Sequence, residues 1–168
     1  MTAFLLAVHV VAAILAVGPV TVAASMFPAA ARRVRSGESC EPPAGSGASG
    51  ASGESDVAAV RLLHRVCRVY AVVGVAVPVF GLATASSLGV LTDAWLITSM
   101  VLTAAAAAIL ALRILPGQEA VLVGLDEGAA PVERAATARL AMFTGVFNLL
   151  WVTVTVLMII RPGSTTGA

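Results

Sequence analysis

Two polar side chains within long uncharged stretches of the sequence are the best candidates for chemistry: the imidazole of His9 and the carboxamide of Asn148. A polar group inside a membrane span is costly, so such residues are functional candidates. At a rise of about 1.5 Å per residue, His9 lies roughly 10 Å from one side of a bilayer and Asn148 roughly 12–15 Å from the other. In a hydrocarbon core of about 30 Å these heights nearly coincide. They predict a hydrogen bond that locks the first and last spans together.

The alternative for His9 is that its imidazole binds a cofactor, haem b or a metal ion. His64 does not complete such a site, because it precedes the second uncharged stretch and most of the membrane would separate the two histidines. We expect His64, beside Arg65, to be solvated among lipid headgroups. The methionines are scattered, and Cys40 and Cys67 lack a ligand spacing. We therefore predict no catalytic residue, no further metal site and two unpaired thiols.

The elements that must position these side chains are membrane helices. The chain has 168 residues, of which 59% are hydrophobic and 11% are charged, whereas soluble domains have about 25% charged residues. Four uncharged runs cover residues 1–31, 69–92, 94–112 and 140–160. Each is close to or above the roughly 20 residues that cross a bilayer as a helix. Helices follow because every backbone group in lipid needs a partner within its own segment.

The predicted fold class is all-α: a single-domain four-helix transmembrane bundle over residues 1–168. The spans are expected at about 2–27, 69–88, 94–115 and 140–160. The Ser/Gly-rich stretch 36–56 is predicted to be a disordered cytoplasmic loop, since it has almost nothing to bury. Residues 119–125 are predicted to form a short interfacial helix. The first run is expected to remain a span rather than a cleaved signal, because its start is uncharged and its arginines follow it.

Two prolines are predicted to have structural roles within the spans. Pro19 follows Gly18 in the first span, and Pro78 lies in the second. A proline lacks the N–H that would bond to the carbonyl four residues earlier, so each is expected to kink its helix. In the second span the released carbonyl would be that of Gly74.

Orientation follows from the arginines. Nine of the ten flank the two long connecting segments, and only Arg161 lies on the other side. The positive-inside rule then predicts a multi-pass protein of the cell (cytoplasmic) membrane with both termini outside. The net charge of +1 favours no nucleic-acid partner. The expected partners are the lipid bilayer and a membrane protein or a second copy of the chain.

The predicted spans hold no Asp, Glu, Lys or Arg. Proton-coupled exporters, ion pumps and voltage sensors need charges inside the membrane, so these functions are disfavoured. We therefore expect a small polytopic membrane protein of non-enzymatic accessory or scaffolding role. A redox membrane protein that uses His9 is the alternative. A channel or carrier is a third class, supported only by the prolines and scattered hydroxyl residues.

The sequence also resembles a known group of proteins. The segments AVHVVAAILAVGP, LLHRVCRVYAVVGVAVPVFGLAT and DAWLITSMVL, and the final RPG, are similar to uncharacterised integral membrane proteins of actinobacterial type. Copper-resistance protein D and HemJ-type protoporphyrinogen oxidases are distant relatives of that group. The resemblance implies a four-helix membrane fold and matches His9 to the group's first-span histidine. The oxidase branch has a basic residue early in the third span, where residues 96–100 of this chain have none, so the redox function stays the alternative.

Overall fold

The structure is a computed structural model that describes residues 2–36, 49–126 and 134–163. The described residues form helices joined by short turns, without strands, which confirms the all-α prediction. The helices are α1 (Thr2–Ser36), α2 (Ser49–Gly74), α3 (Ala76–Leu88), α4 (Ala94–Ile109), a π-helical turn η1 (Leu110–Ile114), α5 (Leu115–Asp126) and α6 (Arg134–Ile160).

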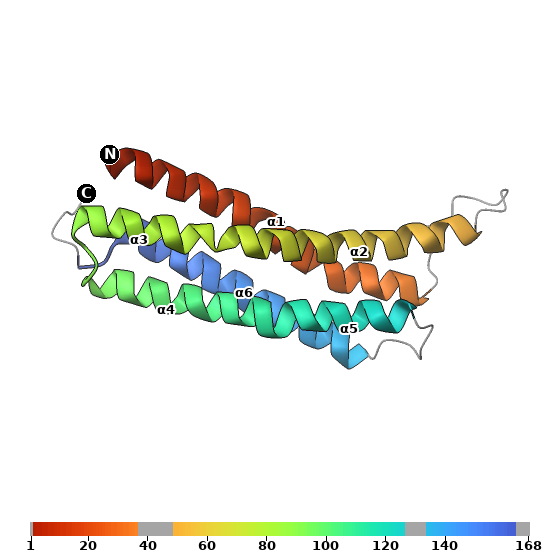
Figure 1. Ribbon diagram of the computed structural model, residues 1–168. Coiled ribbons are helices and arrows are strands. Elements are labelled where there is room, and N and C mark those ends of the chain that lie inside the picture. The colour runs from red at the N-terminus through yellow and green to blue at the C-terminus, as the bar shows by residue number, and fades with distance from the viewer. Residues whose placement is uncertain (1, 37–48, 127–133, 164–168) are drawn as a thin grey trace.

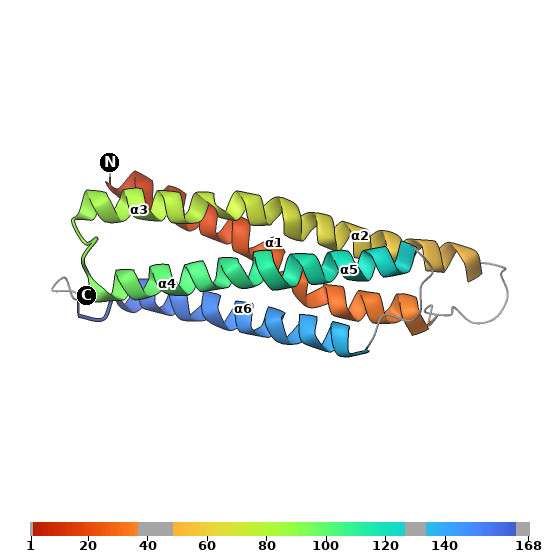
Figure 2. The same cartoon turned by 60° about the horizontal axis from the view of Figure 1, so that its bottom comes forward.

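These elements make four columns (Figure 1). Helices α2 and α3 follow one another in one column, and α4, η1 and α5 make another. Each column contains a segment long and apolar enough to cross a membrane. The first residues of α1 and the last residues of α6 lie at the same end as the turn between α3 and α4, as both ribbon views show (Figures 1 and 2).

Three of the columns are longer than a bilayer requires. The apolar segments Ala3–Val34, Glu54–Leu88 and Ala94–Asp126 contain 32, 35 and 33 residues. A helix of 33 residues is about 50 Å long, against a hydrocarbon core of about 30 Å. The excess lies at the arginine-rich end. There residues 119–125 are helical, as predicted, but they belong to α5, which continues from α4 through η1 instead of forming a separate helix.

The π-helical turn η1 explains how this column continues past a proline. The N–H of Leu115 bonds to the carbonyl of Leu110, five residues earlier. This wider turn directly precedes Pro116, which has no N–H to donate. Helical structure therefore passes into α5 instead of ending at the proline.

The start of α2 also differs from the prediction. Residues 37–48 of the predicted loop lie outside the described residues, but residues 49–56 are helical. Once residues 57–68 are helical, each added residue gains one hydrogen bond without a new nucleation cost, so the helix extends toward its N-terminus.

The two prolines that were predicted to kink their helices lie in different backbone surroundings. Where Pro78 was predicted to kink the second span, the helix is interrupted three residues earlier: α2 ends at Gly74 and α3 begins at Ala76. The N–H of Val75, between them, bonds to the carbonyl of Val72 at 3.1 Å. Helix α1 is one continuous helix with Pro19 and Pro28 inside it, and the kink at Pro19 stays a prediction.

The core runs along the axis of the bundle. Its central cluster takes residues from all four columns: Val20, Ala23, Ala24, Cys67, Ala106, Leu110, Ile114 and Phe147. Small side chains let membrane helices approach closely, which is the packing that replaces a hydrophobic driving force in lipid. A second cluster at the arginine-rich end consists of Phe27, Ala31, Val60, Val121 and Leu140.

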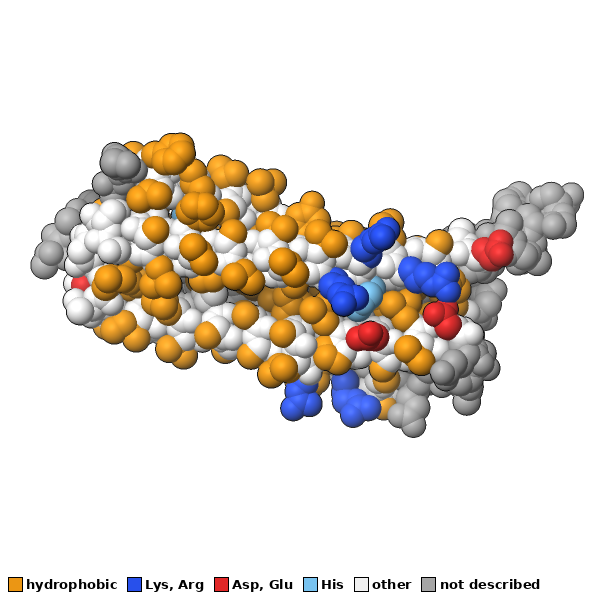
Figure 3. Space-filling model, in the orientation of Figure 1, with side chains coloured by type: hydrophobic (Ala, Val, Ile, Leu, Met, Phe, Trp, Pro, Cys, Tyr) orange, Lys and Arg blue, Asp and Glu red, His pale blue; other side chains and the backbone are white. Residues whose placement is uncertain are grey.

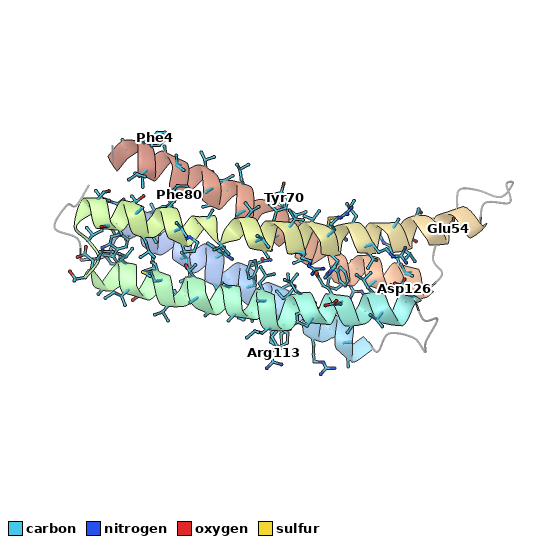
Figure 4. The ribbon with its side chains drawn as sticks, in the orientation of Figure 1. Phe4, Glu54, Tyr70, Phe80, Arg113 and Asp126 are labelled. Atoms are coloured by element: carbon cyan, nitrogen blue, oxygen red, sulfur yellow. The ribbon has the colours of Figure 1, made fainter. Side chains whose placement is uncertain are left out.

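Charge is concentrated at one end of the molecule. The visible Arg, Asp and Glu side chains gather mostly around the start of α2 and the end of α5, while apolar side chains cover the rest of that face (Figure 3). Glu54 and Asp126 lie at this end, and Phe4 and Phe80 lie toward the opposite end (Figure 4). The visible face thus has a mainly apolar part and a charged part at one end.

Two cation–π contacts lie close to a membrane thickness apart. The guanidinium of Arg113 lies 5.7 Å from the ring centre of Phe143, and that of Arg161 lies 5.7 Å from the ring centre of Trp95. The 18 residues from Trp95 to Arg113 correspond to about 27 Å of helix. Arginine and tryptophan are typical of membrane interfaces, and this separation is close to the thickness of a hydrocarbon core.

Candidate functional site

His9 joins α1 to α3. Its Nδ1 atom lies 3.0 Å from the carbonyl oxygen of Val77. The ring lies against Gly81, where an added Cβ would come within 2.9 Å of the Cε1 atom of His9. The absence of a side chain at Gly81 therefore leaves the space that the imidazole of His9 occupies between the two helices.

This contact fixes how the imidazole is protonated. A carbonyl oxygen only accepts hydrogen bonds, so Nδ1 of His9 must carry the hydrogen. In the neutral ring the lone pair is then on Nε2. Metal-binding histidines commonly donate their other N–H to a backbone carbonyl in this way, so His9 has the form of a single potential ligand.

Asn148 does not contact His9, so the predicted imidazole–carboxamide bond was wrong. Its Nδ2 atom instead donates to Oγ of Ser25 in α1 at 3.3 Å. Ser25 is 16 residues from His9, or about 24 Å along the helix. The prediction failed because it counted depth from the start of α1, whereas this helix is longer than the membrane is thick.

A second polar cluster lies at the arginine-rich end, between α2 and α5. The Nδ1 atom of His64 lies 3.1 Å from Oε1 of Gln118, and Nε2 of Gln118 donates to Sγ of Cys67 at 3.5 Å. Gln118 has 1% of its surface exposed and Cys67 has none. Because Oε1 of Gln118 accepts, His64 donates, and the three side chains form one directed chain of hydrogen bonds.

The sequence prediction for His64 was therefore wrong: the ring is half-buried and bonded, not solvated. Gln118 was missed because it was placed in a loop after Pro116. A signal was present, however. Ile114, Gln118 and Val121 follow one another at helical spacing and are all buried, so Gln118 occupies a position on an apolar stripe.

An ion pair lies beside this cluster. The guanidinium of Arg61 in α2 contacts the carboxylate of Asp126 at the end of α5. Both side chains are more than half exposed, so the pair contributes about 0–1 kcal/mol at most. Arg65 and Arg68 are exposed on the same helix, at a depth suited to lipid phosphates.

The chemistry available to these groups is hydrogen bonding between helices. The contacts His9–Val77, Ser25–Asn148 and His64–Gln118 each join two different columns. Within residues 2–36, 49–126 and 134–163, no three His, Cys, Asp or Glu side chains gather in a group that could hold a metal ion. In that part of the chain His9 is thus not a member of such a three-ligand group.

Comparison with protein-family models, curated proteins and solved structures finds no significant match to this chain. The assignment of function therefore depends on the geometry of the bundle and its polar contacts.

Proposed function

We propose that this chain is a non-enzymatic accessory or scaffolding subunit of the cytoplasmic membrane, with both termini outside. Four apolar helical columns support a polytopic membrane protein. The observation that supports the accessory role is that the polar side chains bond one helical column to another. His9, Asn148 and the His64–Gln118 pair all form bonds between columns, which stabilise a rigid bundle.

The proposed orientation rests on the arginines. All the arginines except Arg161 lie at, or lead into, the end with the long helical extensions. Basic residues are retained on the cytoplasmic side of bacterial-type membranes, so we place this end in the cytoplasm.

The accessory role predicts that one face of the bundle meets another membrane protein or a second copy. One exposed apolar residue on each column offers a probe: Ile14, Val72, Val101 and Leu149. A photo-cross-linking side chain would be placed at each in turn, and the native membranes irradiated. A specific adduct of defined mass from one or two of the four positions is expected. Absence of any protein adduct from all four would exclude a stable partner within the membrane.

A specific observation favours one alternative, a haem- or metal-linked redox protein that uses His9. The Nδ1–H of His9 is held by the carbonyl of Val77, which leaves Nε2 as the atom that would bind the iron of haem b or a metal. Haem would supply one-electron chemistry when bound, and the contacts with Val77 and Gly81 would orient the ring. Among the described residues His9 belongs to no group of three or more His, Cys, Asp or Glu side chains.

The visible absorption spectrum distinguishes the accessory function from the redox function. The purified protein in detergent would be titrated with haem, with His9→Ala as the variant and His64→Ala as the matched control. A Soret shift that is lost in His9→Ala and kept in His64→Ala would favour the redox function. An unshifted spectrum of the intact protein would eliminate it.

A further inference from the structure

Two exposed arginines border the seam between α6 and the column of η1 and α5. Arg113 lies in the π-helical turn η1, and Arg139 lies near the start of α6. Neither forms an ion pair with a carboxylate of the described residues. Arg113 projects from the lower edge of the bundle in Figure 4, where basic side chains stand out in the space-filling view of Figure 3. Two positive charges at one seam favour an anionic ligand.

Packing between the two columns places these arginines within one layer of the membrane. A Cβ added at Gly117 in α5 would come 2.9 Å from Cδ2 of Leu140 in α6, so these two residues mark the same height. Arg113 precedes Gly117 by four residues, and Arg139 precedes Leu140 by one. The columns run in opposite directions (Figure 1), so the arginines differ in height by five residues, or roughly 8 Å. A headgroup layer is roughly 5–8 Å thick, so one such layer spans both backbone positions.

The ring of Phe143 holds the guanidinium of Arg113 at the seam. The ring centre lies 5.7 Å from Cζ of Arg113. A guanidinium that stacks on an aromatic face still presents its N–H groups to a phosphate. Arg139 lies one helical turn before Phe143, and its Nε–H donates to the carbonyl of Ala135 at 3.4 Å, which leaves its terminal N–H groups for another acceptor. Guanidiniums held in this way lose less entropy when they bind.

The acidic side chain of this part of α5 lies away from the seam. Glu119 follows Gly117 by two residues, which is about 200° around the helix. Because Gly117 faces α6, Glu119 lies on the far side of α5. It therefore does not neutralise Arg113 and Arg139.

An apolar stripe of α6 runs from Arg139 toward the middle of the membrane. Met142, Val146 and Leu149 follow Arg139 at helical spacing, and all three are exposed. The ten residues from Arg139 to Leu149 correspond to about 15 Å, which is half of a hydrocarbon core of about 30 Å. A charged end followed by an apolar stripe one leaflet long matches a phospholipid better than a free phosphate ion.

We propose that Arg113 and Arg139 bind the phosphate of an anionic phospholipid, with an acyl chain along the stripe of Met142, Val146 and Leu149. The phosphate oxygens accept charge-assisted hydrogen bonds from the guanidiniums, and the ring of Phe143 keeps Arg113 in position. Arg113 lies in a π-helical turn, and such turns inside helices are frequent at functional sites. This site goes beyond the accessory role and requires only that the columns lie in a bilayer.

The test is native mass spectrometry of the intact protein, released from detergent micelles titrated with phosphatidylglycerol or with zwitterionic phosphatidylcholine. Phosphatidylglycerol should bind more tightly. Arg113→Gln and Arg139→Gln should each weaken its binding about fivefold, the effect of one basic residue at an anionic membrane surface. Arg68→Gln is the matched control, because Arg68 is exposed on α2 and follows Cys67, which Gln118 contacts at nearly the same height. It should leave the affinity unchanged.

Phe143→Leu separates a defined site from general attraction, because it leaves the net charge unchanged. It should weaken phosphatidylglycerol binding about threefold, through loss of the cation–π contact. An unchanged affinity in this variant would overturn the role of the ring. Equal losses in Arg68→Gln and the two seam variants, or equal affinities for the two lipids, would overturn the site. Displacement of the lipid by inorganic phosphate at equal concentration would overturn the phospholipid as the ligand.

Discussion

The imidazole ring of His9 occupies the space that a side chain at position 81 would need. A Cβ added at Gly81 would come 2.9 Å from Cε1 of His9 and 3.3 Å from Nδ1. The same ring lies 3.0 Å from the carbonyl of Val77, one helical turn earlier in α3. The close approach of α1 to α3 thus depends on one histidine and one glycine that lie far apart in the sequence.

Gly81→Ala should destabilise the bundle by about 1–3 kcal/mol, because the added methyl group forces the His9 ring from its place. Equilibrium unfolding in mixed detergent micelles measures the change. Gly145→Ala is the control, since nothing lies within 4 Å of a Cβ there. It should be neutral or stabilising, by up to about 1 kcal/mol. Equal losses in the two variants would contradict the contact with His9.

His9→Ala should cost about 0.6–2 kcal/mol through the lost hydrogen bond to Val77. The same variant should also remove the steric clash that a side chain at position 81 makes with the His9 ring. In the His9→Ala background, Gly81→Ala is then expected to cost less than half of its value in the intact chain. A double-mutant cycle on the unfolding free energy measures this coupling. Strict additivity would show that the ring does not fill the space above Gly81.

Gln118→Leu should destabilise the arginine-rich end by about 1–3 kcal/mol, because the ring of His64 and the thiol of Cys67 lose their shared partner. Hydrogen exchange of α2 and α5 measures where the loss occurs. Arg61→Ala, at the exposed ion pair, is the control and should change stability by less than about 1 kcal/mol. The hypothesis fails if the control has the larger effect.

Membrane orientation can be tested with the two cysteines. Cys67 is fully buried, so labelling of the folded protein reports on Cys40 in the predicted loop. A membrane-impermeant thiol reagent should leave intact cells unlabelled and react after the membrane is opened. Cys40→Ser should abolish the signal. Labelling of intact cells would reverse the proposed orientation.

The uncharged runs were sufficient to predict four membrane-crossing columns, because apolar stretches of about 20 residues without a charge are typical of membrane helices. They could not predict where the helices end. Hydropathy identifies the segment that prefers lipid, but it does not say where the helix that contains this segment ends. Helix α5 continues past the end of the apolar run and buries the polar side chain of Gln118.

The hydrogen-bond partners of the polar residues could not be predicted from the sequence either. His9 bonds to a backbone carbonyl, and backbone groups are the same at every residue, so no residue type marks Val77 as the acceptor. A local disturbance of the helix near Pro78 was predictable because a proline acts on the turn that precedes it in its own helix. Contacts between helices depend on tilt and depth, and these come from packing.

The long column of α4, η1 and α5 has a consequence for anything that approaches from the arginine-rich side. Asp126 lies thirteen residues beyond Arg113, so the tip of α5 stands about 20 Å above the level of that guanidinium. The end of α1 and the beginning of α2 lie at the same end of the bundle as the end of α5 (Figure 1). A soluble protein arriving from that side would meet these helix tips before it reached the lipid headgroups.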